Sequence, residues 1–195
     1  GLLLYLAGMI IFLGIITGEI FYPSGYTTST NEISDLGSTR PPNSVIYQPS
    51  ATIFNLTMII SGSMILVATG WLHRFLQKRW VSLLFGLFGL GILRVGIFPG
   101  NRVPYHGIFA MLTFMSGGVT AIFSSKMTQP PFRYAGITLE SIALLFLFTS
   151  NWFIPVLGSG GTERWVAYPI ILWLIGFGGY LLGRSKKTTY DTSSG

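Results

Sequence analysis

The sequence predicts an all-α fold: a polytopic membrane helix bundle with six transmembrane helices, both termini cytoplasmic, and one long outer loop between helices 1 and 2. The first observation is composition, since half of the 195 residues are hydrophobic and only 9% are charged, whereas charged residues make up about a quarter of a soluble domain. The second is that apolar stretches of about 20 residues recur, which is the length an α-helix needs to cross a bilayer. The third is that Lys and Arg collect in alternate connections between these stretches.

Composition also excludes several kinds of chemistry. The chain has no cysteine, so it contains no disulfide, iron–sulfur cluster, thiolate zinc site or cysteine nucleophile. Its formal net charge is +6, but the basic residues lie in short connections between apolar stretches, where the preference of positive charge for the cytoplasmic side explains them. Nucleic acid is therefore not an expected partner.

Proline and glycine mark where the helices begin and end. Pro23 stops the first apolar stretch, Ser50 offers an N-cap for the second, and Pro99 ends the third. Pro130-Pro131 separate the fourth from the fifth, and the glycine-rich residues 158–161 separate the fifth from the sixth. The expected helices cover about 2–22, 51–72, 80–98, 107–125, 134–154 and 165–183, followed by a polar, mobile cytoplasmic tail over 184–195.

The distribution of Lys and Arg predicts the orientation in a cell membrane, because short cytoplasmic loops retain positive charge. The sequence places eight of these residues on one side and three on the other. The side with eight, and with both termini, is therefore expected to be cytoplasmic, and the long loop is expected outside. The first set is Arg74, Lys78, Arg79, Lys126, Arg133, Arg184, Lys186 and Lys187, and the second is Arg40, Arg102 and Arg164.

Three charged residues fall inside the expected helices, where a charge raises the free energy of membrane insertion by about 2.5–3.5 kcal/mol. Each of these residues therefore needs an interaction partner or a functional role. Glu19 and Arg94 each lie about one turn from the outer end of their helix, so we expect them to meet. Glu140 lies almost two turns from the inner end of the fifth helix, within reach of Arg133 or Lys126.

A cluster of polar residues on the outer side is the candidate site, and two interpretations of it are open. Its charges pair to pin the long loop onto the helix ends, or the loop is a lid over a pocket in which arginines bind an anionic headgroup. In the second case Asp35 or His106 would transfer protons. The cluster consists of Glu19, Glu32, Asp35, Arg40, Arg94, Arg102, His106, Glu163 and Arg164.

The sequence shows no complete catalytic or metal-binding set. Ser34, Asp35 and His106 supply the residue types of a nucleophile, an orienting acid and a base, but the side chains of adjacent residues diverge in most conformations. Zinc hydrolases use three protein ligands, and the two histidines, His73 and His106, lie on opposite membrane faces. We therefore expect no catalytic residues, no metal and no cofactor.

Several short motifs resemble a known family. The chain is similar, from about Gly8 to Gly183, to the prokaryotic six-helix membrane proteins catalogued as domain of unknown function 998, through Ile33-Ser34-Asp35-Leu36-Gly37, Phe54-Asn55, Phe98-Pro99-Gly100-Asn101 and His106. That family is similar in layout to the Frag/DRAM/Sfk membrane proteins, some of which are linked to lipid-anchor remodelling and lipid homeostasis. The resemblance implies a six-helix fold and draws attention to Asp35, Gly37, Asn55, Pro99 and His106, but supplies no substrate. The seven-helix metal-dependent lipid hydrolases would require histidines at helix ends that this chain lacks.

These observations lead to two main functional hypotheses. In the first, an outer pocket binds the headgroup of a membrane lipid near Arg94, Arg102 and Arg164. In the second, the protein is a structural or accessory subunit that packs against other membrane protein subunits through smooth, glycine-rich helix faces. A third, transport through the bundle, is disfavoured because polar residues do not form a continuous path along the helices.

Overall fold

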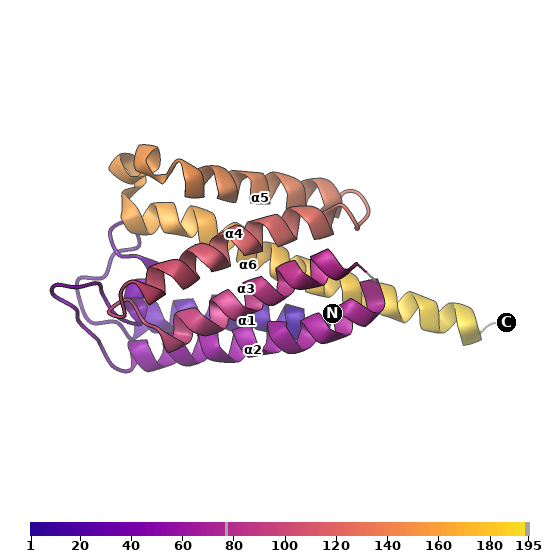
Figure 1. Cartoon of the computed structure of the whole chain (residues 1–195), viewed down its shortest axis with the longest axis horizontal. Helices are drawn as coiled ribbons and strands as arrows, with labels where there is room; N and C mark the ends of the chain where they lie inside the picture. Colours follow the sequence, from indigo (N-terminus) through magenta and orange to yellow (C-terminus); the bar gives the residue numbers. More distant parts are fainter. Residues whose placement is uncertain (77, 194–195) are drawn as a thin grey trace.

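The structure is a computed structural model that describes residues 1–76 and 78–193, and it confirms the all-α prediction (Figure 1). The described chain forms six α-helices and one short 3₁₀ helix, η1, within the connection between the first two helices. Their bounds are α1 Leu2–Ile20, η1 Ile33–Leu36, α2 Ser50–Leu76, α3 Arg79–Ile97, α4 Tyr105–Ser125, α5 Phe132–Phe148 and α6 Ser150–Ser193.

Five of the six helices in the described chain are long and apolar enough to cross a membrane, namely α1, α2, α3, α4 and α6. The remaining helix, α5, corresponds to the fifth expected span; it has 17 residues and ends at Phe148, where the sequence predicted a helix to about residue 154. The Thr149 hydroxyl donates to the carbonyl of Leu145 at 2.5 Å, and the polar residues Thr149, Ser150 and Asn151 compete with the backbone for hydrogen bonds. The chain therefore turns at Thr149.

Helix α6 is longer than the sequence predicted. It begins at Ser150, in residues predicted as the end of the fifth helix, and continues through residues 155–164, where a connection was expected. The glycine-rich stretch is a kink at Gly158, whose φ of 77° and ψ of 169° are accessible to glycine and costly for other residues. Beyond Arg184 the helix continues to Ser193 through the segment predicted as a mobile tail, and residues 194–195 of that tail lie outside the described residues.

Each helix packs against the next along the chain, and α1 closes the bundle by packing against α6, which also contacts α4. The long connection, residues 21–49, lies at one end of the bundle, and both termini lie toward the other (Figure 1). We call these the loop end and the termini end. The direction in which the two ends face across a membrane stays a prediction.

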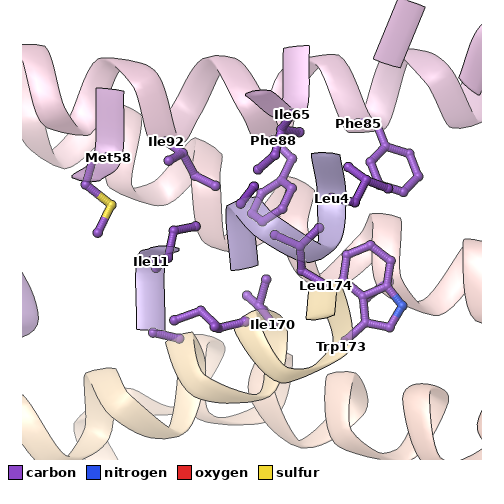
Figure 2. Packing of buried hydrophobic residues seen from close by; sticks show 14 of the residues in the cluster. Leu4, Ile11, Met58, Ile65, Phe85, Phe88, Ile92, Ile170, Trp173 and Leu174 are labelled. Atoms are coloured by element: carbon purple, nitrogen blue, oxygen red, sulfur yellow. The ribbon is translucent and has the colours of Figure 1, made fainter. Parts of the chain in front are cut away.

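The apolar core lies between α1, α2, α3 and α6 (Figure 2). Trp173 is its largest buried side chain, with 2% exposure, and its ring centroid lies 5.8 Å from that of Phe85 and 5.4 Å from that of Phe177. Other core members drawn in Figure 2 are Leu4, Ile11, Met58, Ile65, Phe88, Ile92, Ile170 and Leu174.

Helices α2 and α3 approach closely because small residues face each other there. A methyl group added at Gly62 would lie 2.7 Å from the Cα of Leu93 and 2.8 Å from the carbonyl oxygen of Gly89, both of them rigid backbone atoms of α3. The same addition at Gly70, two turns further along α2, meets nothing within 4 Å.

We therefore expect Gly62→Ala to destabilise the protein by roughly 1–3 kcal/mol, because α2 must move away from α3. Gly70→Ala is the matched control and should be neutral or stabilise by about 0.5–1 kcal/mol, since alanine loses less backbone entropy in a helix. Thermal unfolding of both variants in the same detergent measures the difference. Equal shifts would show that the α2–α3 contact is not as close as described.

Candidate functional site

The long connection folds over the loop end of the bundle and is fastened there by η1. Ile33 and Leu36 are buried at 5% and 0% exposure, so η1 inserts two apolar side chains between the helices. Asp35 Oδ2 accepts the backbone N–H of Glu32 at 3.0 Å and the Asn31 side-chain amide at 3.5 Å. Asp35 thus caps its own turn, and among the described contacts it pairs with no arginine.

Arg164 of α6 connects the loop to two helices. One terminal nitrogen, Nη2, donates to Glu19 Oε1 of α1 at 2.6 Å and to the hydroxyl of Tyr26 at 2.6 Å. The other, Nη1, donates to the carbonyls of Thr28 at 2.8 Å, Asn31 at 2.9 Å and Gly160 at 3.0 Å. With 7% of its surface exposed, Arg164 is buried, and a planar guanidinium suits several fixed acceptors at once. The expected Glu19–Arg94 pair is therefore wrong.

Tyr26 supports the same arrangement from within the loop. Its hydroxyl accepts from Arg164 and donates to the carbonyl of Glu32 at 3.3 Å, and its ring lies 5.7 Å from the guanidinium carbon. Burial raises the pKa of Tyr26, and this effect is larger than the opposing effect of the positive charge of Arg164. The phenol therefore stays protonated and keeps both hydrogen bonds.

Two glycines of α6 let the loop backbone approach the helix. A Cβ at Gly158 would collide with the carbonyl oxygen of Ser29, and one at Gly160 would collide with that of Asn31. The N–H of Gly161 donates to the Ser29 carbonyl at 3.1 Å, and the Ser159 hydroxyl donates to the Thr30 carbonyl at 2.7 Å. The glycine-rich stretch is thus a docking surface for residues 28–31.

The remaining charges of the predicted cluster do not converge. Arg94 lies over the rings of Phe98 and Phe109, at 5.9 and 5.8 Å from their centroids, and Arg102 is exposed. Glu32 forms an ion pair of 2.6 Å with Arg40, whose side chain is 62% exposed. The structure therefore does not bring Arg94, Arg102 and Arg164 together around an open pocket.

His106 and Glu163 face the inside of the bundle. His106 is 3% exposed, and its Nδ1 lies 2.8 Å from the Phe98 carbonyl. Because a carbonyl only accepts, Nδ1 carries a proton, and Nε2 has no partner among the described hydrogen bonds. Glu163 Oε2 accepts the backbone N–H of Ile33 and so holds the start of η1.

Both residues line a small interior pocket of about 70 Å³, which we call the interior pocket. Apolar side chains from five helices form its walls, and η1 contributes Ile33 and Ser34. An apolar cavity of roughly 150 Å³ takes up a molecule as small as benzene, so a space of about half that volume is too small for a lipid.

A larger hollow, of about 440 Å³, lies on the side of the bundle between α5 and α6, and we call it the α5/α6 groove. Its walls are apolar and include Leu139, Leu157 and Leu172. At the loop end it is lined by Thr28 and Ser29 of the connection together with Arg164 and Tyr168 of α6. Leu172 and Trp165, also in its lining, are about half exposed, so the groove opens on the surface of the bundle.

The sequence did not indicate Tyr26, Thr28 or Tyr168 as parts of the site. Thr28 acts mainly through a backbone carbonyl, which every residue possesses, so its identity carries no signal. The one usable signal was the glycine-rich stretch 158–161, which indicates a close backbone approach as well as a turn. No group of three or more His, Asp or Glu side chains in the described part of the chain is placed to hold a metal ion.

Apolar helices of this length and number define a multi-pass helical membrane protein with an ordered connection at one end. The chain belongs to the family described as "Protein of unknown function (DUF998)", whose profile matches residues 5–180. This confirms the resemblance drawn from the short motifs, while the likeness to the Frag/DRAM/Sfk proteins stays a prediction. No curated protein matches the chain, and no solved structure does.

We predict that Arg164→Lys destabilises the protein on the order of 2 kcal/mol, because one ammonium group cannot reach Glu19, Tyr26 and the loop carbonyls together. Arg40→Lys is the matched control and should change stability by less than about 0.5 kcal/mol, since its ion pair is exposed to solvent. Thermal unfolding reports stability, and limited proteolysis within residues 21–49 reports release of the loop. Similar losses in both variants would contradict the role assigned to Arg164.

Proposed function

We propose that the protein binds a membrane lipid in the α5/α6 groove, with the polar end of the lipid at the loop residues Thr28 and Ser29. The observation that carries this proposal is the groove itself, whose mainly apolar lining also includes the loop residues Thr28 and Ser29 beside Arg164 and Tyr168. Its volume, about 440 Å³, falls within the range of roughly 300–1,000 Å³ common for ligand sites, whereas the interior pocket falls well below it.

The polar lining favours a lipid with hydroxyl or ester groups over one recognised by its negative charge. The charge of Arg164 is balanced by Glu19, and its terminal nitrogens already donate to five acceptors. Arg94 and Arg102, the other arginines expected around an anionic headgroup, do not line the groove. The hydroxyl groups of Thr28, Ser29 and Tyr168 are neutral donors and acceptors, which suit uncharged oxygen atoms of a lipid.

Filling the groove should reduce the amount of bound lipid. Leu172→Trp adds a large side chain to its lining, and Leu83→Trp is the matched control on the exposed face of α3, where Leu83 is 63% exposed. After purification in mild detergent, mass spectrometry of extracted lipids should show a several-fold loss of co-purifying lipid in Leu172→Trp and no change in Leu83→Trp. Unchanged lipid in both variants would reject the groove as the site.

The same preparation tests the competing proposal that the chain is an accessory subunit of a membrane complex. A stoichiometric polypeptide that co-migrates on a native gel, without bound lipid, would favour the subunit role. Lipid bound to a protein that migrates alone would favour the lipid-binding role.

We further propose that the protein lies in the cell membrane with both termini in the cytoplasm and residues 21–49 outside. The excess of Lys and Arg on the termini side supports this orientation. Because the chain has no cysteine, single substitutions can report it: Asn43→Cys in the loop should react with a membrane-impermeant thiol reagent in intact cells, and Gln129→Cys, between α4 and α5, should react only after lysis. The reverse pattern would invert the proposed orientation.

A further inference from the structure

Helix α5 packs into the bundle through a stripe of three buried residues, and the middle one is an acid. The stripe is Gly136, Glu140 and Ala143, spaced so that all three lie on one helix face. Glu140 has no exposed surface, and neither carboxylate oxygen has a hydrogen-bond partner among the described residues. The start of α5, at the termini end, is about 12 Å away along the helix axis.

Two more polar groups without partners lie beside the same stripe. The Ser125 hydroxyl of α4 and the indole nitrogen of Trp173 of α6 are both buried and make no hydrogen bond within the described chain. A Cβ built at Gly136 would collide with Ser125 Oγ and would lie 3.5 Å from Cδ1 of Trp173, the carbon bonded to the indole nitrogen. Gly136 precedes Glu140 by one turn, so helices α4, α5 and α6 each place a polar group in one small region.

The basic residues expected near Glu140 are engaged elsewhere. Arg133 of α5 donates from Nε and Nη2 to the carbonyl of Thr128, at 2.8 and 2.5 Å, and Lys126, after α4, lies 5.1 Å from the ring centroid of Phe123. The prediction that either would approach Glu140 is therefore wrong.

The titratable groups of α6 nearest in sequence to Trp173 also have other neighbours. Tyr168 lines the α5/α6 groove, and Tyr180 stacks on Phe132 with Arg184 over its ring. Tyr134 of α5 is 64% exposed, on the surface of the helix. None of these groups donates to the carboxyl of Glu140.

An ionised carboxylate without a cation or hydrogen-bond donor is costly in such surroundings, because burial removes its hydration without replacing it. Taking up one proton from the aqueous phase converts the carboxylate to a neutral carboxylic acid and removes that cost. With side-chain movement, the acid can donate its O–H to the Ser125 hydroxyl, and its other oxygen can accept from the Trp173 indole N–H.

We propose that Glu140, Ser125 and Trp173 form a proton-binding site inside the bundle, in which Glu140 is a neutral acid at neutral pH. The packing of α5 against α4 and α6 then depends on an occupied proton site. This inference does not rest on the α5/α6 groove or on lipid binding.

Dicyclohexylcarbodiimide tests the proposal on the unmodified protein, because it reacts with protonated carboxylic acids in apolar surroundings. Peptide mass spectrometry should place the adduct on Glu140, and the labelling rate should fall several-fold as pH is raised above neutral. No adduct on Glu140 would overturn the proposal. Protection by Na⁺ at constant pH would also overturn it, by showing a cation site instead.

A second measurement uses variants. Glu140→Gln is isosteric with the neutral acid, so it should keep the thermal unfolding temperature of the original protein and weaken the infrared carbonyl band of protonated carboxyl groups. Glu32→Gln is the control, because Glu32 is ion-paired at the surface, and it should keep that band. Retention of the full band in Glu140→Gln would contradict the proposal, and the adduct map of the unmodified protein decides the question if this variant does not fold.

Discussion

The ordered state of the long connection depends on one buried guanidinium. Arg164 binds α1 through Glu19 and binds the connection through Tyr26 and the carbonyls of Thr28 and Asn31. A connection of this length has no core of its own, and without fixed contacts its conformational entropy would keep it mobile. The cost of burying Arg164 is offset because an opposite charge and several aligned acceptors replace its hydration. Other contacts of the loop, including those of η1, further stabilise the loop in the position that Arg164 defines.

Much of the fold could be predicted from the sequence, because bilayer-length apolar stretches and proline breaks are local signals. The six helices were recognised this way, and η1 forms within the motif of residues 33–37 that carries the family resemblance. The partner of Glu19 was not predictable in the same way. Sequence position gives the depth of a residue along a helix, but it does not give the direction in which the side chain points around the bundle. Arg94 and Arg164 both lie near the loop end, and only helix packing selects Arg164.

Parts of both interpretations of the polar cluster apply once its residues are placed, although the arginines do not surround a pocket. Pairing of charges does hold the loop in place, through Arg164 rather than Asp35. Two hollows, the interior pocket and the α5/α6 groove, lie on different sides of α6 below the loop. Glu163 and Arg164 are neighbours and therefore point about 100° apart around the helix. Glu163 accordingly lines the interior pocket and holds η1, while Arg164 lines the α5/α6 groove and holds residues 28–31.

This arrangement gives the loop a direct connection to whatever occupies the groove. Thr28 presents its carbonyl to Arg164 and also lines the groove, and Ser29 lines the groove while its carbonyl accepts from Gly161. A molecule that contacts these two residues therefore touches the segment that the guanidinium holds in place. A ligand that binds more tightly when the loop is docked also stabilises the docked loop, because the two equilibria are linked. Ligand binding and loop docking both depend on the same position of residues 28–31. The loop is thus both fastened by α6 and part of the wall of the proposed lipid site, so its stability and its ligand affinity should change together.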